Sequence, residues 1–268
     1  MSAPPPSDDP CQALTRERDY DAYVAALFAP ADKRPALYAI KAFSLEVASV
    51  RDRVSEPLPG EVRLQWWRDA LSGEARGNVT AHPIAARLLA AIERYRLPRE
   101  PFLDLIEART FDLYDDPMPS TADFEGYAGE AFAAPLRLAT LVLADGGDPG
   151  PADAAGHAGV ALAVASALRD LQRHRARGQV FVPGDLLTRH GVTREAFLAD
   201  PQAWVIADFA QLGLQHLSTF ERYLEAIPPA VAPAFLPVAA AALQLRAKTA
   251  PIATWRRIFA IWRLSRRF

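Results

Sequence analysis

Residues 160–183 read VALAVASALRDLQRHRARGQVFVP, and this stretch decides how the rest of the chain is interpreted. Its first half is apolar or small at nearly every position, as in a helix that is buried on most sides. Asp170 and His174 follow four residues apart, so a continuing helix places both on one face. Gly178 and a short apolar run that ends at Pro183 then close the segment. We predict a central helix with two polar side chains near its carboxyl end.

This order of features resembles the second aspartate-rich motif of the squalene/phytoene synthase family. In that motif, D-x-x-x-D precedes glycine-arginine and an aromatic-aliphatic-proline triplet. Four positions agree in type and spacing: Asp170, Gly178, Phe181 and Pro183. Two positions depart from the motif, because His174 replaces the second aspartate and Gln179 replaces the arginine. The resemblance extends over residues 15–265, and the order of the motifs supports it more strongly than any single motif does.

A second stretch, residues 36–52, reads ALYAIKAFSLEVASVRD and resembles the helix that carries the family's first aspartate-rich motif. That motif also needs two carboxylates four residues apart, and this chain has Ala48 and Asp52 at the two positions. Trp67 and Arg68 match a tryptophan-arginine helix that follows the first motif in family members. Each motif therefore keeps one aspartate and lacks the other.

The resemblance implies an all-α fold, namely a single-domain helical bundle of the isoprenoid-synthase type. Family members ionise an allylic prenyl diphosphate, and Mg²⁺ held by carboxylates on two facing helices neutralises the charge that develops. By their positions in the motifs, Asp52 and Asp170 are the candidate catalytic and Mg²⁺-binding residues. The resemblance also gives the candidate substrate contacts: Tyr38, Arg51, Trp67, Arg68, Arg169, Arg173 and Phe181.

The missing carboxylates weaken this metal site. Mg²⁺ prefers oxygen ligands in near-octahedral geometry, so neither Ala48 nor His174 replaces an aspartate well. Three arginines near the same turns add positive charge: Arg51, Arg169 and Arg173. We therefore expect the cavity to bind Mg²⁺ poorly and to attract an anion directly.

A simpler structural interpretation remains open for each of these residues. Asp52 and Asp170 are also explained as partners of neighbouring arginines in a buried ion-pair network. His174 is explained as a hydrogen-bonded polar residue, because the five histidines of the chain show no metal-binding spacing. The aromatic side chains near both motifs are explained as core residues, although in this fold the core also lines the pocket.

Two runs, residues 45–56 and 180–192, resemble one branch of the family that contains a mitochondrial complex I assembly factor. That branch is regarded as having lost prenyl-transfer activity. Our main hypothesis is a non-catalytic or weakly active protein, peripheral to a membrane, that assists assembly of respiratory complex I. The alternative is an active Mg²⁺-dependent prenyltransferase that condenses two prenyl diphosphates head-to-head. A third hypothesis is a carrier that holds an isoprenoid lipid without reacting it.

Composition limits these hypotheses further. The chain has 268 residues, half of them hydrophobic, and a formal charge of −2, which gives no reason to expect nucleic acid as a partner. None of the predicted helices is a long apolar run, so we expect no membrane-spanning helix. The first residues lack the basic and apolar regions of a secretory signal. Cys11 has no partner for an internal disulfide, so we expect a cytoplasmic protein that contacts the inner membrane face peripherally.

The order of apolar residues and breakers predicts helices only. Residues 1–12 are expected to be a disordered tail, and residues 13–268 to form one domain. Besides the central helix, the predicted helices are 13–28, 32–54, 61–71, 83–95, 101–114, 122–143, 202–226, 232–245 and 250–266. A short capped turn is predicted at residues 193–198.

The last predicted helix has an amphipathic pattern. Four apolar side chains recur at spacings of three and four: Trp255, Ile258, Phe259 and Trp262. Five arginines accompany them without an acidic residue: Arg256, Arg257, Arg263, Arg266 and Arg267. The pattern fits either a helix packed on the bundle with solvated arginines, or an anchor on an anionic membrane surface.

Overall fold

The computed structural model describes residues 9–268, and all regular elements among these residues are helical, which confirms the predicted all-α class. The α-helices are α1 (Pro10–Arg18), α2 (Tyr20–Ala26), α3 (Arg34–Ala48), α4 (Pro57–Ser72), α5 (Pro83–Tyr95), α6 (Glu100–Phe111), α7 (Thr121–Ala128), α8 (Ala134–Ala144), α9 (Ala152–Arg169), α10 (Leu171–Ala176), α11 (Gly184–Arg189), α12 (Arg194–Ala199), α13 (Ala203–Arg222), α14 (Val238–Ala247) and α15 (Thr254–Ser265). Short 3₁₀ and π segments join them: η1 (Arg51–Arg53), η2 (Val79–Ala81), η3 (Gly129–Ala133), η4 (Leu224–Ala226) and η5 (Pro229–Ala234).

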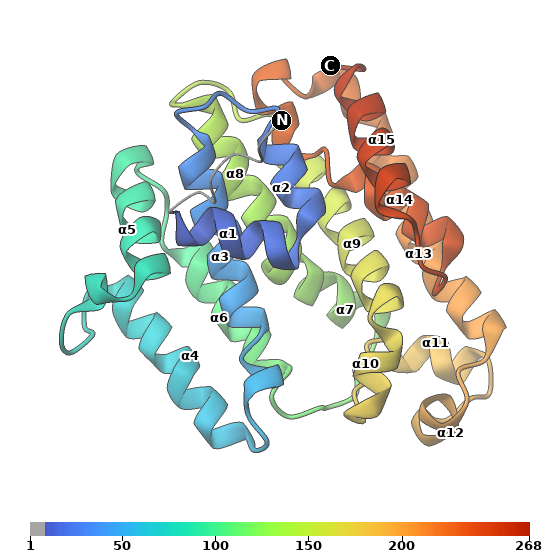
Figure 1. Cartoon of the computed structure of the whole chain (residues 1–268). Coiled ribbons are helices and arrows are strands. Elements are labelled where there is room, and N and C mark those ends of the chain that lie inside the picture. Colours follow the sequence, from blue (N-terminus) through green and yellow to red (C-terminus); the bar gives the residue numbers. More distant parts are fainter. Residues whose placement is uncertain (1–8) are drawn as a thin grey trace, which may run out of the picture.

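Helix α9 lies in the middle of the bundle, as its sequence predicts, and packs against η3, α8, α13 and α14 (Figure 1). Two glycines allow the close approach of its neighbours. A Cβ added at Gly159 would lie 2.5 Å from the Cβ of Ala133 in η3, and one added at Gly213 of α13 would lie 3.1 Å from Val164. Small residues at these contacts, rather than large interlocking ones, therefore set the spacing between the central helices.

Helices α1 to α6 form the other half of the bundle. α3 packs against α1, α5 and α8, and α4 packs against α6 at the opposite edge of the molecule from α13 to α15 (Figure 1). Phe43 of α3 contacts both Trp67 of α4 and Phe102 of α6 edge to face, at centroid distances of 5.1 and 5.5 Å. This buried aromatic cluster fixes α4 and α6 relative to α3.

The prediction of a disordered N-terminal tail is wrong for residues 10–12, which belong to α1. α1 begins at Pro10, because the Asp9 carboxylate accepts hydrogen bonds from the amides of Cys11 (2.8 Å) and Gln12 (3.2 Å) and so caps the helix. Cys11 is fully buried rather than part of a tail, and burial raises the pKa of its thiol to about 12. The rest of the predicted tail, residues 1–8, lies outside the described residues.

Several predicted helices are divided where a polar side chain or a turn interrupts them. The predicted helix 13–28 ends at Arg18 and restarts at Tyr20, since the Asp19 carboxylate accepts a hydrogen bond from the amide of Ala22 (3.0 Å). The central helix likewise ends at Arg169, and α10 starts at Leu171. The predicted helix 122–143 contains the π turn η3, and α11 was not predicted at all.

The C-terminal helices are shorter than predicted. The predicted helix 232–245 is 3₁₀ up to Ala234 and α-helical only from Val238, because Pro233 and Pro237 interrupt it. α15 begins at Thr254 rather than residue 250 and packs on α2 and α14. Within the part of the chain that the structure describes, no helix combines the length and apolar character that crossing a membrane requires.

Candidate functional site

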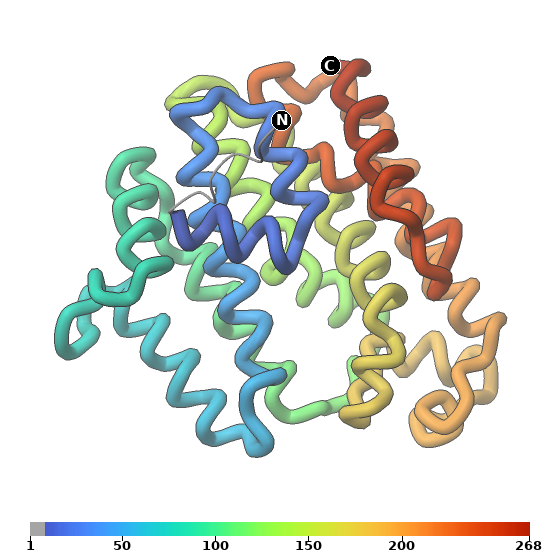
Figure 2. The backbone as a smooth tube through the Cα atoms, in the orientation of Figure 1, coloured from blue at the N-terminus to red at the C-terminus, as the bar shows by residue number. Residues whose placement is uncertain are grey.

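A cavity of about 700 Å³ lies in the bundle and is lined mainly by α3, α9, η3, α14 and the junction between α1 and α2. About half of its wall is apolar, and the larger apolar side chains are Leu37, Ile40, Leu45, Phe132, Leu136 and Leu162. The cavity volume falls in the range typical of small-molecule sites. Near the cavity, the segment that joins α6 to α7 passes from the α3 side of the bundle to the α10 side (Figure 2).

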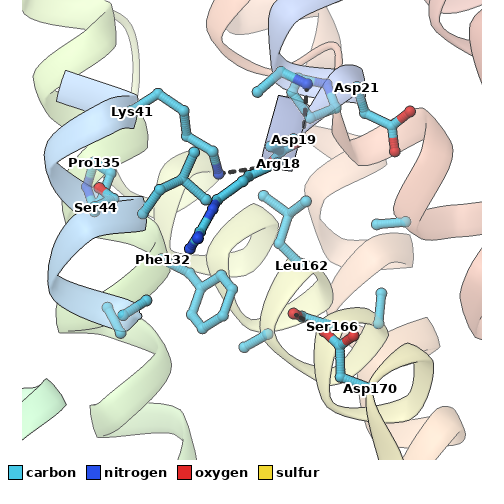
Figure 3. Close-up of a pocket in the computed structure, with 18 of the residues that line it drawn as sticks. Arg18, Asp19, Asp21, Lys41, Ser44, Phe132, Pro135, Leu162, Ser166 and Asp170 are labelled. Carbon is cyan, nitrogen blue, oxygen red and sulfur yellow. Dashed lines mark hydrogen bonds and ion pairs between the residues drawn. The ribbon is translucent and has the colours of Figure 1, made fainter. Parts of the chain in front are cut away.

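Charged side chains gather on one part of the cavity wall (Figure 3). Arg18 projects between Phe132 and Leu162, while Asp19 at the junction of α1 and α2 pairs with Lys41 of α3 at 2.6 Å. Asp170 lies at the end of α9, across the opening from these groups. The cavity therefore combines an apolar interior with a strongly polar rim.

The two aspartates that remain of the sequence motifs line this same cavity. Asp52 lies in η1 and Asp170 at the junction between α9 and α10, so the fold brings both motifs together. Arg173 contacts both carboxylates, at 3.7 Å from Asp52 and 3.4 Å from Asp170. Arg177 forms a second ion pair with Asp52. Both aspartates thus take part in ion pairs with arginines, in a network that is partly exposed rather than buried.

The other two predicted arginines are also paired. Nε and Nη2 of Arg51 donate to the two carboxylate oxygens of Asp115, at 3.2 and 2.5 Å, and this hydrogen bonding raises the pKa of Arg51. Arg169 lies 3.4 Å from the neighbouring Asp170 and is half exposed. Arg169, Arg173 and Arg177 share only two carboxylates, those of Asp52 and Asp170, so this part of the wall keeps more cationic than anionic side chains.

The positions that depart from the motifs have lost their charge. Ala48 ends α3 and lines the cavity, while His174 is buried and contacts Phe181 edge to face at 4.8 Å between ring centroids. Burial lowers the pKa of His174 to about 4, so the ring is neutral at physiological pH. Gln179 is buried beside Arg177, from which its amide oxygen accepts a hydrogen bond (3.3 Å).

Not all of the predicted substrate contacts lie in the cavity. Tyr38 and Phe181 line it, but Trp67 and Arg68 do not. Trp67 packs in the aromatic cluster with Phe43, and Arg68 pairs with Glu107 at 2.6 Å on α6. Trp67 and Arg68 therefore do not line this cavity as predicted, because Trp67 points toward Phe43 of α3 and Arg68 toward Glu107 of α6.

A sequence profile of the squalene/phytoene synthase family matches residues 15–265. The chain belongs to the squalene/phytoene synthase family. Among curated relatives, complex I assembly factor 6 of Mus musculus is 34% identical over 233 residues, which cover 84% of this chain and 69% of that protein. The human protein of the same name is 32% identical over 237 residues (86% and 70%). Phytoene synthase of Rhodobacter capsulatus is 26% identical over 192 residues (72% and 56%).

Solved structures of the same family share the fold, as the sequence resemblance implied. A dehydrosqualene synthase superposes with a TM-score of 0.77 at 17% identity and covers 96% of this chain and 94% of its own. Squalene synthase HpnC from Alicyclobacillus acidocaldarius superposes with a TM-score of 0.71 at 26% identity, covering 88% and 90%. The predicted isoprenoid-synthase helical bundle is confirmed.

The residues present do not fit the Mg²⁺ site that this family implies. Mg²⁺ requires several oxygen ligands arranged around one point. Within residues 9–268 no group of three or more histidine, cysteine, aspartate or glutamate side chains is arranged to hold a metal ion. The two motif carboxylates, Asp52 and Asp170, instead receive the guanidinium of Arg173. The positive charge between the two remaining motif carboxylates therefore comes from a side chain of the protein, Arg173, and not from a bound metal ion.

Several charged residues of the cavity wall were missed by sequence reasoning. Arg177 was the nearest to being found, because it follows Arg173 by four residues and therefore extends the same helical face. Two further pairs, Asp19–Lys41 and Asp21–Arg257, join different helices, and no local pattern indicates them. The pair of Arg109 and Asp112 is local, because the two residues are only three positions apart.

Proposed function

We propose that this chain is a non-catalytic or weakly active squalene/phytoene synthase-like protein that associates with a membrane peripherally and assists assembly of respiratory complex I. The observation that carries the proposal is the bridge from Arg173 to Asp52 and Asp170. A catalyst of this family needs exchangeable divalent cations between these motifs, and here a fixed guanidinium takes the same partners. The ionisation of a diphosphate lacks its main electrostatic support without such cations.

The names of the relatives favour the assembly role. Complex I assembly factor 6 is the name of mammalian proteins that are 32–34% identical to this chain over most of its length. Because function resides in sites rather than in folds, the degenerate motif positions matter more to this proposal than the shared bundle does. We place the protein in the cytoplasm, on the inner face of the membrane that contains the complex.

The membrane contact is proposed from α15. Three aromatic side chains on its outer face are exposed: Trp255 (65%), Phe259 (53%) and Trp262 (48%). Ile261 is fully buried on the opposite face, and Ile258 packs with it, so the predicted stripe is divided between core and solvent. Exposed aromatic residues with arginines beside them fit the interfacial region of an anionic bilayer.

Deleting the gene in its own organism tests the assembly role. We expect native gels stained for NADH dehydrogenase activity to lose the fully assembled complex and to accumulate smaller subassemblies. The wild-type gene should restore assembly, and so should a variant with Asp52→Asn and Asp170→Asn, because the proposed role needs no metal-dependent catalysis. Normal complex levels in the deletion strain, or rescue by the wild type alone, would count against this proposal.

One observation favours the alternative of an active prenyltransferase that condenses two prenyl diphosphates head-to-head. The cavity has not closed, and both surviving aspartates still line it from facing elements. Relatives such as the phytoene synthase of Rhodobacter capsulatus carry the name of such an enzyme. Loss of an isoprenoid hydrocarbon, rather than of complex I, in the deletion strain would select this alternative.

A further inference from the structure

We propose that helix α15 is a movable cover of the cavity, and that its contact with a membrane opens the cavity to the apolar chains of bilayer lipids. The inference deepens the proposed function, because it rests on the membrane contact that we assign to α15. It follows from the thin cavity wall beneath α15, the weak ion pair that holds this helix, and the strained connection that precedes it.

The cavity wall is thin where α15 covers it. Ala25 of α2 and Ala240 of α14 line the cavity, and both also belong to the cluster of buried residues that includes Ile261 of α15. α15 packs against α2 and α14 and lies along their outer side (Figure 1). Small side chains therefore separate the cavity from the inner face of α15 at these two positions.

The apolar contacts of α15 are largely separate from the main core. Ile261 is the one side chain of α15 that is buried among the described residues, and it packs in a small cluster with Val24, Ala25, Leu236 and Ala240. Within residues 9–268, the buried members of the main core cluster include none from α15. Displacing α15 thus disturbs fewer buried contacts than displacing a central helix would.

One ion pair connects α15 to α2 at the cavity wall. Arg257 donates a hydrogen bond to Asp21 at 3.1 Å, and the Asp21 side chain is only 10% exposed. Oδ1 of Asp21 and Nε of Arg257 are buried without a hydrogen-bond partner in the described part of the chain. Burial raises the pKa of the Asp21 carboxyl although Arg257 lies beside it. A buried pair repays its lost hydration only when its other polar atoms are also satisfied, so this pair holds α15 weakly.

The connection from α14 to α15 is strained. Lys248, which follows the last residue of α14, has φ of +57° and ψ of −107°, a combination that side chains other than glycine rarely adopt. Gln244 of α14 lines the cavity and donates to the carbonyl oxygens of Lys248 (2.7 Å) and Ala250 (3.2 Å). A residue of the cavity wall therefore holds this connection in place, and movement of α15 would release the strain.

A bilayer removes the main obstacle to this movement. In water, displacing α15 would expose Ile258 and Ile261, which is unfavourable. At a membrane surface the same side chains enter the acyl region together with the exposed aromatic residues of the outer face, so leaving the bundle does not expose them to water. Opening of the cavity is therefore expected at a membrane and not in solution.

Photo-crosslinking of the full-length protein tests the proposal. The probe is a phosphatidylglycerol vesicle in which some acyl chains carry a diazirine, and cross-linked peptides are identified by mass spectrometry. We expect cross-links on cavity-lining residues of α3 and α9, such as Ile40 and Leu162, as well as on α15. Cross-links confined to α15 would overturn the proposal although the membrane contact stands. Absence of any cross-link would refute the membrane contact as well, and the gene-deletion result depends on neither outcome.

A thiol placed beneath α15 tests the ion pair in solution. Val24 belongs to the cluster around Ile261 and does not line the cavity, so N-ethylmaleimide reaches the thiol of Val24→Cys only when α15 moves. We expect the additional change Asp21→Asn, which leaves Arg257 without a counter-ion, to speed this labelling roughly tenfold or more. Cys11 adds little background, because it is fully buried and its thiol pKa is about 12.

Two controls separate movement of α15 from unfolding. Val142→Cys places a thiol at a fully buried position of α8 and should stay unlabelled when combined with Asp21→Asn. Asp208→Asn removes the ion pairs of Asp208 with Arg189 and His190, away from α15, and should not speed labelling of Val24→Cys. Slow labelling of both thiols in Asp21→Asn would contradict the role of the ion pair. Fast labelling of both would mean that α15 does not move independently, and either result overturns the proposal.

Discussion

At the scale of single residues, Arg173 holds the two remaining motif carboxylates together although their two partner carboxylates are missing from the motifs. Its guanidinium contacts Asp52 and Asp170, which would repel each other if they faced a cavity without a cation. Arg177 adds a second contact to Asp52. Ala48 and His174 contribute no negative charge, so Asp52 and Asp170 are the only motif carboxylates, and the arginines neutralise these two.

Restoring both motif carboxylates should restore affinity for a metal ion. The double variant Ala48→Asp with His174→Asp adds two oxygen ligands at the motif positions, so we expect it to bind Mg²⁺ at least roughly tenfold more tightly than the wild type does. Isothermal titration with MgCl₂ measures this. The matched variant Ala48→Asn with His174→Asn has nearly the same shape without the charge and should not gain affinity. Equal affinities of the two double variants would contradict the electrostatic explanation.

His174 should make folding sensitive to acid. Burial lowers the pKa of its ring to about 4 in the folded protein, against an ordinary value of 6.5. The unfolded chain therefore binds a proton below pH 6.5 that the folded protein does not bind. Stability is lost as the pH falls from about 6.5 to about 4, by up to about 3 kcal/mol.

The variant His174→Gln isolates this effect, because other groups titrate equally in both proteins. Urea unfolding at several pH values should give a difference between wild type and variant that is constant above pH 7. Below pH 6.5 the difference should move in favour of the variant. A difference that stays constant down to pH 4 would mean that the ring is protonated in the folded state.

At the scale of elements, the contact between α9 and η3 depends on a missing side chain. A Cβ at Gly159 would lie 2.5 Å from Ala133 Cβ and 2.7 Å from its backbone nitrogen, which cannot move as a flexible side chain does. Gly159→Ala should therefore destabilise the protein by about 1–3 kcal/mol. Gly156 is in the same helix with open space around it, so Gly156→Ala should be neutral or stabilising by up to about 1 kcal/mol.

Urea unfolding of these two alanine variants makes a controlled comparison, because the change in helix propensity is the same at both positions. We expect Gly159→Ala to lower the free energy of unfolding and Gly156→Ala to leave it unchanged or raise it, because only Gly159 is crowded by Ala133. Similar effects would show that propensity, rather than the distance between α9 and η3, determines the result.

Helix α15 should bind anionic membranes through its outer face. Five arginines lie on α15 or directly after it, and one of them, Arg257, pairs with Asp21 of the bundle. The four that form no ion pair within the described residues are Arg256, Arg263, Arg266 and Arg267. Each basic residue near an anionic surface contributes roughly 1 kcal/mol, so four suffice for reversible attachment. We expect co-sedimentation with phosphatidylglycerol liposomes and little with phosphatidylcholine, weakened by salt.

Two variants of α15 separate the aromatic from the electrostatic contribution. Changing Trp255, Phe259 and Trp262 to serine should reduce binding at all salt concentrations, whereas changing Arg263, Arg266 and Arg267 to glutamine should abolish mainly the salt-dependent part. The matched control changes Leu58 and Val62 to serine, since both are exposed apolar residues on α4. If the aromatic variant sediments like this control, α15 does not contact the bilayer.

At the scale of the whole molecule, local sequence patterns predicted the helices but not the meeting of the two motifs. Periodicity and breakers determine most helices, whereas it was the resemblance to the squalene/phytoene synthase family that implied that Asp52 and Asp170 face one cavity. The local patterns did not predict the division at Asp19, because a capping side chain competes with helix continuation only in its folded context. Element bounds near polar residues therefore differ most from the prediction.

The partners of the charged residues were not predictable for a different physical reason. Arg51 pairs with Asp115, sixty-four residues later, and Arg68 turns toward Glu107 because α4 packs on α6. Such pairs depend on how helices that are distant in the sequence pack together, and the amino-acid pattern of one helix does not indicate this packing. The sequence thus indicated which arginines lie near the cavity but not which carboxylates they contact.

The last prediction concerns catalysis by the intact protein. Incubated with farnesyl or geranylgeranyl diphosphate and MgCl₂, the wild type should release no pyrophosphate above the rate without protein. The reason is that both motif carboxylates are engaged by Arg173 and so do not hold the Mg²⁺ that would neutralise the leaving diphosphate. A coupled pyrophosphate assay and extraction of C30 and C40 hydrocarbons measure the two products independently. Pyrophosphate together with either hydrocarbon would establish a prenyltransferase, and would mean that one aspartate in each motif is sufficient for activity.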